Sequence, residues 1–298
     1  MLMNRRSFLS RSALIAAGAV VPAALTGCGG GRSGADDSKA TGLSVHLNGR
    51  EVARQEVLEW EARRLQVIAK RMSQNLPAAL VGELVALLLR PEVSTANIAQ
   101  ERVALAEAKI LAGDEAMRRL VATDLLLTNQ IVELAVAAPL GWSVCEIGIV
   151  SNRGSAEGFA RWFNDKSFHD DPYAMLVACP DHFLLKAVPP RGMEVIEITG
   201  GAMQASRFLI DYDNLGDLPL VIDPDFPVRF SGAAVNGNGT VIGGLNHRFR
   251  TLAEGFESHL AIVFPAALPP WMISEHRWHL ACEFSNWITA YIEETGDR

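Results

Sequence analysis

The chain has 298 residues, of which 49% are hydrophobic and 20% charged, and its formal net charge is −7. This is a globular composition, long enough for one large domain or for a domain with an extension. The acidic balance argues against nucleic-acid binding, which needs basic surface to neutralise phosphates. The few cysteines exclude a disulfide-rich framework but leave one bridge among Cys145, Cys179 and Cys282 open.

The N-terminal residues predict export across a membrane. Arg5 and Arg6 precede an apolar run from Ala13 to Leu25, about half of the ~20 residues that a spanning helix needs. Paired arginines before a short apolar run indicate a twin-arginine signal peptide rather than a membrane span. The "LTGC" that follows resembles a bacterial lipobox and predicts cleavage before Cys28, with lipid on its sulfur. An ordinary signal peptide with a chance cysteine is the alternative.

The sequence divides into four regions. Residues 1–27 form the signal peptide, and residues 28–45, which include "GGGRSGADDSKATG", form a flexible tether. Residues 46–139 form a helical region, and residues 140–298 form a strand-rich domain. We therefore expect a protein held by its lipid on the periplasmic or extracellular side of a bacterial membrane.

The helical region is predicted from apolar side chains that recur every three or four residues. In "EVARQEVLEWEARRLQVIAKRM" they include Val57, Leu65 and Met72, with no internal Gly or Pro. The sequence defines no protein partner for this region. The pattern predicts four helices, at residues 51–72, 75–90, 94–113 and 114–138.

After Pro139, β-branched and apolar runs separated by Gly, Pro, Asn and Asp predict strands. "NGNG" at residues 236–239 indicates a hairpin turn. A short helix is expected at residues 156–165 and a long one from about Ser274 to Glu293. Strands closed by one long helix predict an antiparallel α+β domain, with a ligand cavity between a curved sheet and that helix. The expected strands are residues 142–150, 174–188, 193–200, 206–213, 219–223, 228–235, 239–252 and 255–265.

A metal site is suggested by "HRWHLACEF" in the C-terminal helix. His279 and Glu283 are four residues apart, so both side chains can reach one point from adjacent turns. Imidazole nitrogen and carboxylate oxygen are ordinary zinc ligands. His276 lies one turn earlier and could be a ligand, a group behind the ligands or a solvent-exposed residue. The alternative is a polar stripe on a surface helix.

Two further polar residues stand in apolar strands. Glu197 lies in "MEVIEITG", where a buried carboxylate would need a partner, often a cation; an edge strand with Glu197 in water is the alternative. His247 lies in "GGLNHRFRTL" and could point into the cavity as a hydrogen-bond donor or proton-transfer group, or could be structural. Motifs for a nucleophile elbow, a Walker loop or dinucleotide binding are missing where their supporting structure would be needed.

Four segments together resemble the zinc-dependent acylphloroglucinol hydrolases, the group of 2,4-diacetylphloroglucinol hydrolase and phloretin hydrolase. "RWFNDKSFHDDPYAMLVACPDHF" resembles the family's Trp-Phe helix with the tyrosine and Pro-Asp-His segment that follow. "VIEITGG" resembles its glutamate-bearing strand, and "NHRFRTLAEGFESHLAIVF" is similar to its histidine-arginine hairpin. "HLACEFSNW" resembles its terminal helix. The resemblance covers residues 140–295 and not the N-terminal helices.

The resemblance implies a helix-grip (Bet v 1-like) fold with a zinc ion between the sheet and the long helix. Carried over by position, Glu197, His279 and Glu283 would be metal ligands, and His247 would be a catalytic residue beside the substrate. The implied reaction is hydrolysis of the carbon–carbon bond between an acyl group and a (poly)phenolic ring in a small acylated aromatic substrate.

One ligand of the family is missing at its expected position. The family's first histidine ligand falls on Lys166, and an ammonium group cannot bind zinc. His169, three residues later, would lie on the same face of a continued helix and is the expected replacement ligand. His182 is a second substitute, outside the ligand set that the resemblance implies. Otherwise the site has lost a ligand and its metal.

Three functions fit these features. The first is an exported, lipid-anchored, zinc-dependent hydrolase of an acylated aromatic compound. The second is a non-catalytic helix-grip protein that binds a small hydrophobic ligand, with a metal site degenerate at Lys166. The third is a structural lipoprotein whose helices bind another protein. The joint presence of Glu197, His247, His279 and Glu283 favours the hydrolase, because a fold does not need such a polar set for stability.

Overall fold

The computed structural model describes residues 42–88, 94–169 and 171–297. The predicted signal peptide, the predicted lipidation site Cys28 and most of the predicted tether lie outside these residues. The helices are α2 (Arg54–Asn75), α3 (Ala78–Leu88), α4 (Ile98–Ala112), α5 (Asp114–Leu120), α6 (Ala122–Ala137), α7 (Ala156–Phe168), α8 (Pro172–Val177) and α9 (Pro270–Thr295). The strands are β1 (Leu43–Leu47), β2 (Arg50–Val52), β3 (Trp142–Ser151), β4 (His182–Val188), β5 (Gly192–Ile198), β6 (Ala205–Asp211), β7 (Val228–Val235), β8 (Val241–Thr251) and β9 (Phe256–Pro265).

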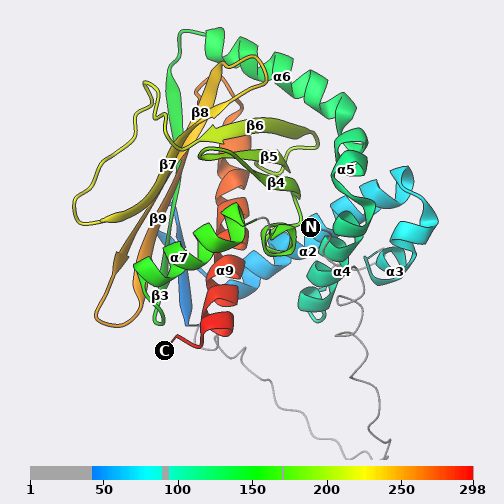
Figure 1. The fold of residues 1–298 in the computed structure, drawn as a ribbon, viewed down its shortest axis with the longest axis horizontal. Coiled ribbons are helices and arrows are strands. Elements are labelled where there is room, and N and C mark those ends of the chain that lie inside the picture. Colours follow the sequence, from blue (N-terminus) through cyan, green and yellow to red (C-terminus); the bar gives the residue numbers. More distant parts are fainter. Residues whose placement is uncertain (1–41, 89–93, 170, 298) are drawn as a thin grey trace, which may run out of the picture. The chain divides into compact units, whose positions relative to one another are not determined.

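The strands form one antiparallel sheet in the order β2-β1-β3-β9-β8-β7-β6-β5-β4. The sheet is curved, and α9 runs along one of its faces (Figure 1). In β3, Cys145, Ile147 and Ile149 are buried at alternate positions, as expected for a strand with one face on the core. The prediction of an α+β domain with an antiparallel sheet and a long C-terminal helix is confirmed.

Helix α9 is buried on all sides over its middle turns. Pro270 occupies its first turn, where the missing N–H costs nothing, and Gly296, with φ of +70°, ends it in the left-handed region. Every residue from Leu280 to Ile288 is buried. Polar side chains of this segment are therefore shielded from water and need partners within the protein.

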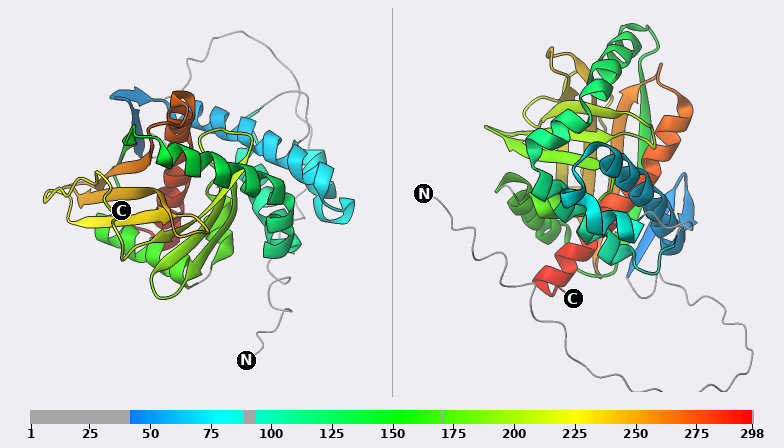
Figure 2. Two further views of the ribbon diagram at one scale, coloured as in Figure 1. Left: turned by 90° about the horizontal axis from the view of Figure 1, so that it is seen from above. Right: turned by 90° about the vertical axis from the view of Figure 1, so that its right-hand side faces the viewer.

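Helices α5 and α6 lie along the part of the sheet that contains β4, β5 and β6, and α2, α3 and α4 lie beside it (Figures 1 and 2). In α2, Arg54 donates a hydrogen bond of 2.7 Å to Asn286 of α9. Arg118 of α5 pairs with Glu194 of β5, and Thr128 of α6 donates to the carbonyl of Ala205 in β6. The predicted helical region thus packs directly on the sheet and on α9.

The predicted fourth helix is two helices, α5 and α6, which meet at 63°. Val121 separates them with φ of −111° and ψ of 7°, outside the helical range, and its side chain is fully buried. Burial of Val121 against the core turns the chain so that α6 can cross the sheet. Among the described residues no single helix is long and apolar enough to span a membrane, although this bent pair passes that test together.

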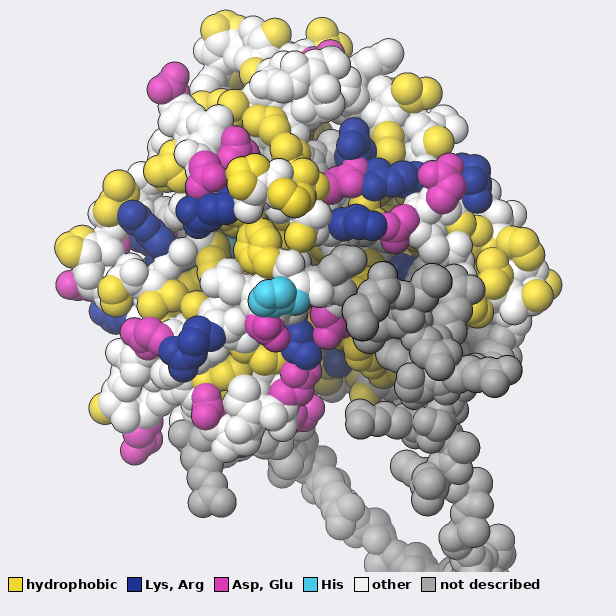
Figure 3. All heavy atoms as spheres, viewed as in Figure 1, with side chains coloured by type: hydrophobic (Ala, Val, Ile, Leu, Met, Phe, Trp, Pro, Cys, Tyr) yellow, Lys and Arg dark blue, Asp and Glu magenta, His cyan; other side chains and the backbone are white. Residues whose placement is uncertain are grey.

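Helix α6 exposes apolar side chains to solvent. Leu126 and Leu134 are 72% and 74% exposed, and Leu127 and Ile131 are each close to half exposed. Hydrophobic side chains reach the surface over α6 in Figure 3, while acidic and basic side chains are interspersed over the rest of that face. The outer face of α6 is therefore more apolar than helix packing alone requires.

Three segments differ from the predicted secondary structure. Residues 43–52 form a hairpin, β1 and β2, because Asn48 and Gly49 both adopt positive φ in a two-residue turn. Residues 174–177 belong to α8 instead of a strand, because Asp171 caps the amide of Ala174 and Pro172 occupies the first turn. Residues 219–223 form no strand, since prolines at 219, 224 and 227 remove ladder donors.

Candidate metal centre

Four polar side chains from three elements converge between the sheet and α9. His182 begins β4 and stands opposite Glu197 of β5 in the strand register. His279 and Glu283 lie one turn apart on α9 and face the same point. All four side chains are at least 90% buried. The fold therefore brings the predicted ligands Glu197, His279 and Glu283 together, with His182 as their fourth neighbour.

The two histidine nitrogens are spaced from each other and from each carboxylate as ligands of one small ion would be. His182 Nε2 lies 3.3 Å from His279 Nε2, 3.1 Å from a carboxylate oxygen of Glu283 and 3.9 Å from one of Glu197. His279 Nε2 lies 3.7 Å from each carboxylate. Ligands about 2.0–2.1 Å from zinc in a tetrahedron are about 3.3 Å apart, which falls inside this range.

The proton on His182 is fixed by the backbone. Its Nδ1 lies 2.9 Å from the carbonyl oxygen of Met175, which can only accept, so Nδ1 carries the hydrogen. In the neutral ring Nε2 then presents a lone pair to the Glu283 carboxylate, an acceptor facing an acceptor. Such a contact requires a proton or a cation between the two atoms. A backbone carbonyl behind the ring is also the common support of a metal-binding histidine.

His279 is supported from behind by a carboxylate. Its Nδ1 lies 3.8 Å from Asp181, which is fully buried and held by Arg64 at 2.8–2.9 Å. At 3.8 Å Asp181 is beyond hydrogen-bond distance, so it acts on the ring through its charge, which raises the basicity of the imidazole. Lys109 of α4 donates to the carbonyls of Pro180 and His182. These hydrogen bonds fix the segment that carries Asp181 and His182.

The charges of the group are coupled. Burial opposes the charged form of His279, but the carboxylates of Glu197, Asp181 and Glu283 hold its pKa well above 6.5. Burial likewise opposes ionisation of Glu283, yet His182 and His279 hold its pKa far below the ordinary value. Burial raises the pKa of Glu197 despite both histidines. The group thus favours net positive charge at its centre, which a proton or a metal ion can supply.

A third donor type lies beside the two histidines. Cys179, His182 and His279 are fully buried, and one ligand atom from each lies within 4.8 Å of the others, so this group could hold a metal ion. Cys179 Sγ is 3.8 Å from His279 Nδ1, the ring nitrogen that faces Asp181 rather than Glu197 and Glu283. Cys145, Cys179 and Cys282 are all free thiols, so the described residues contain no disulfide.

The predicted replacement ligand His169 does not join this group. It ends α7, its side chain is 78% exposed, and its Nδ1 pairs with Asp165 at 2.8 Å. Lys166 also points elsewhere and pairs with Glu294 at 2.9 Å and Asp171 at 3.3 Å. Although burial acts against its charge, these carboxylates raise the pKa of Lys166. Helix α7 ends at this point, so it cannot carry His169 round to the buried face.

His182 takes the position that was expected for His169. Its signal in the sequence is the "PDH" segment just before a strand, but its role depends on the β4–β5 register, which places it opposite Glu197. Asp181 and Cys179, in the same segment, were not predicted as site residues. The sequence predicts one strand over residues 174–188, so it does not predict the turn between α8, which ends at Val177, and β4, which begins at His182.

Two further histidines face the interior beside the group. His247 of β8 packs edge-on against Phe284, and burial lowers its pKa to about 4, so it is neutral. His276 stacks on His279, and burial and that neighbour lower its pKa well below 6.5. The Nδ1 atom of each has no hydrogen-bond partner among the described residues. Buried nitrogens without partners are available to a ligand or to water.

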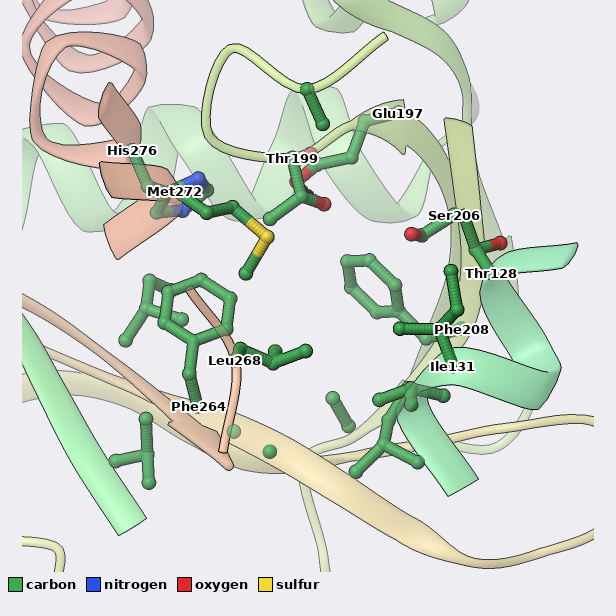
Figure 4. A pocket seen from close by; sticks show the side chains of 18 of the residues that line it. Thr128, Ile131, Glu197, Thr199, Ser206, Phe208, Phe264, Leu268, Met272 and His276 are labelled. Carbon is green, nitrogen blue, oxygen red and sulfur yellow. Dashed lines mark hydrogen bonds between the residues drawn. The ribbon is translucent and has the colours of Figure 1, made fainter. Parts of the chain in front are cut away.

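Two adjacent chambers lie beside this site. A chamber of about 80 Å³ is lined by His247, Glu283 and Glu197, and a larger one of about 240 Å³ is lined by Glu197 and His276. Figure 4 shows Glu197, Thr199 and His276 at one side of the larger chamber. His182 and His279 line neither chamber. The two carboxylates therefore face the cavity and the two ligand-type histidines lie behind them.

No family model and no curated protein matches this chain. The resemblance to acylphloroglucinol hydrolases stays a prediction from the residues of four segments. What the protein does must therefore be inferred from the geometry of the buried group and of the two chambers beside it.

Proposed function

We propose that this protein is a metal-dependent hydrolase in which His182, Glu197, His279 and Glu283 hold a zinc ion. The observation that carries the proposal is the convergence of their donor atoms at 3.1–3.9 Å with both histidines supported from behind. Two histidines and two carboxylates are an ordinary zinc ligand set. A zinc ion held there supplies a Lewis acid for an acyl carbonyl.

The substrate we propose is an acyl group attached to an aromatic ring. The smaller chamber is lined by aromatic side chains, including Phe163, Tyr212, Phe230 and Trp287, which can pack against a ring. It is bounded by the two carboxylates, so a ring seated there brings its attached carbonyl next to the ligand atoms. This supports cleavage of the bond between the ring carbon and the acyl carbon.

His247 is the residue we assign to proton transfer. In the hydrolysis, the oxygen of water bonds to the acyl carbon, the bond to the ring carbon breaks, and a proton must reach the ring carbon. His247 is neutral, lines the aromatic chamber and has an unpartnered Nδ1, so it can take a proton from water and give it to the ring. Glu197 and Glu283 would hold the metal ion beside the chamber, where the ion would supply a Lewis acid for the carbonyl.

The fold and the cellular location belong to the same proposal. A curved antiparallel sheet on a long C-terminal helix supports a helix-grip fold. The paired arginines and "LTGC" support twin-arginine export and a lipid anchor at Cys28 on the outer side of a bacterial membrane. Neither feature is needed for the chemistry of the buried group.

Turnover of an acylphenol tests the proposal. We expect zinc-loaded protein to release the free phenol and the carboxylic acid, and Glu283→Ala to abolish both release and metal binding. His247→Gln should keep the metal and slow release by about 10²–10⁴-fold. His169→Ala, at the exposed end of α7, is the matched control and should change neither. Release at the parental rate in Glu283→Ala would contradict the proposal.

A second function is favoured by the apolar lining of the larger chamber, which needs no metal to bind a ligand. In this alternative the protein binds a small hydrophobic compound without turning it over. Glu283→Ala separates the two, because a binding protein would keep its affinity for the ligand in this variant. A hydrolase would lose metal and turnover in the same variant.

A further inference from the structure

The larger chamber differs in chemistry from the aromatic one. It lies beneath α6, with a volume of about 240 Å³, and reaches the surface beside Ile131 and Trp271, which are 46% and 55% exposed. Figure 4 shows Ile131 and Thr128 of α6 facing Met272 and Leu268 across the space. Most of its lining is aliphatic, and includes Val132, Ile242 and Val263.

Its titratable groups, Glu197 and His276, lie with Thr199 at the end next to the metal-site residues, while Ser206 lies near Thr128 (Figure 4). Thr199 donates to Glu197 at 3.4 Å, and His276 lies on the same side of the chamber (Figure 4). Thr128, further along, has its hydroxyl bonded to the carbonyls of Asp124 and Ala205, so it offers little to a ligand. A ligand that lies along this chamber would therefore be polar at one end and apolar over the rest.

The two chambers share walls at the same end. Glu197, His276, Phe208 and Leu245 line both, so the two chambers are adjacent. A molecule with its carbonyl at Glu197 would place an aromatic ring in the small chamber and its remaining substituent in the large one. A two-carbon acyl group would leave most of the large chamber without a ligand.

We propose that the chamber beneath α6 binds an unbranched aliphatic chain, and that the substrate is an aromatic ketone with a medium-length acyl chain. That the chain is the acyl part of a substrate rests on the proposed hydrolase function. That the chamber binds a chain does not rest on it. Helix α6 contributes Ile131 and Val132 to the wall of this chamber, so the chain would lie against α6.

Calorimetric binding of phenyl alkyl ketones to the full, zinc-free chain tests the inference. With acyl chains from two to about ten carbons, Kd should fall about fourfold for each added methylene until the chamber is filled, which corresponds to about 0.8 kcal/mol per methylene. Kd values that do not change with chain length would overturn the inference.

Two variants of α6 locate the binding. Ile131→Asp places a charge on the chamber wall and should weaken the longest ketone at least about tenfold, while leaving the two-carbon ketone unchanged. Leu134→Asp, three residues away, 74% exposed and outside both chambers, should change neither. Equal weakening by both variants would overturn the inference. Ala234→Phe narrows the same chamber from β7 and leaves α6 unchanged. This variant should likewise weaken the binding of long-chain ketones only.

Zinc analysis of separate samples of the same protein, purified without chelator and not stripped of metal, separates this inference from the proposed function. Chain-length dependence in a protein that binds no zinc would support the chain site and refute the hydrolase. Zinc binding without chain-length dependence would overturn the chain site alone.

Discussion

His279 lies between carboxylates on both of its ring nitrogens, so its proton is the main competitor of a metal ion. Asp181 faces Nδ1, and Glu197 and Glu283 face Nε2. These carboxylates outweigh the effect of burial and hold the pKa of the ring well above 6.5. A metal can bind Nε2 only after that nitrogen has lost its proton.

Zinc affinity should therefore fall as the pH is lowered. Below the raised pKa of His279, each pH unit should weaken binding about tenfold for each proton that the metal displaces. Competition with a chromophoric chelator at a series of pH values measures this slope. Affinity that stays constant between about pH 8 and 6 would show that His279 is not protonated in the metal-free site.

The support behind His279 gives a second prediction. Asp181→Asn keeps the shape of the side chain but removes the charge that orients and polarises the imidazole, so zinc affinity should fall about 10–100-fold. Asp165→Asn is the matched control, because Asp165 supports the exposed His169 in the same way. Equal zinc affinity in the two variants would exclude His279 as a supported ligand.

Sequence spacing was sufficient for ligands on one element but not for those between elements. His279 and Glu283 meet because a helix repeats every 3.6 residues, which can be read from the sequence. His182 meets Glu197 through strand register, and that register depends on where the turn after α8 ends. His169 was predicted from helical spacing, yet α7 stops before it.

At the level of elements, α7 packs so closely on α9 that it leaves no space for a methyl group at one position. An added Cβ at Gly158 would collide with the hydroxyl of Tyr291, which is fully buried and cannot move aside. Gly158→Ala should lower the free energy of unfolding by about 1–3 kcal/mol. Gly82→Ala in α3, which meets open space, should raise it by about 0.5–1 kcal/mol.

Chemical denaturation of the two variants measures these opposite effects. A stabilised Gly158→Ala protein would show that α7 and α9 are not in the contact described here.

Helix α5 is fixed to the sheet by a charged group with a defined pH response. Hydrogen bonds from Arg118, opposed by burial and aided by Arg207, lower the pKa of Glu194 to about 2. Because this pKa is lower in the folded than in the unfolded chain, the stabilisation is complete above the ordinary value of 4.5. It is lost as the pH falls toward 2.

Glu194→Gln should therefore lower the free energy of unfolding at neutral pH by about 1 kcal/mol, and so lower Tm. On acidification the variant should lose less stability than the parent. Glu115→Gln, which breaks an exposed pair with Arg119 on the same helix, should have almost no effect. Thermal melts of parent and variants between about pH 7 and 3 provide the comparison. A parent and a Glu194→Gln variant that lose Tm equally on acidification would contradict the lowered pKa.

Helices and strands with a clear hydrophobic periodicity could be predicted from the sequence. Elements that depend on a local turn or cap could not. The alternation of β3 and the length of α9 are visible in the sequence, and both formed as expected. The β1–β2 hairpin depends on positive φ at Asn48 and Gly49, and α8 on the Asp171 cap. The break at Val121 depends on its burial between helices, which no local pattern reveals.

On the scale of the whole molecule, the N-terminal helices complete the buried group. Arg64 of α2 holds Asp181, and Lys109 of α4 holds the backbone around His182. Both supports come from the region that the family resemblance does not cover. The fold class could be predicted because strands and helices follow one another in separate runs, whereas the contribution of the helices depends on packing across the whole chain.

Metal content, measured by elemental mass spectrometry on protein purified without chelator, tests the central claim most directly. We expect about one zinc per chain in the parent, in His169→Ala and in Lys166→His, since these residues lie outside the buried group. His182→Ala and His279→Ala should each lose it. Full zinc content in His182→Ala, or no metal in the parent, would contradict a zinc site built on His182, Glu197, His279 and Glu283.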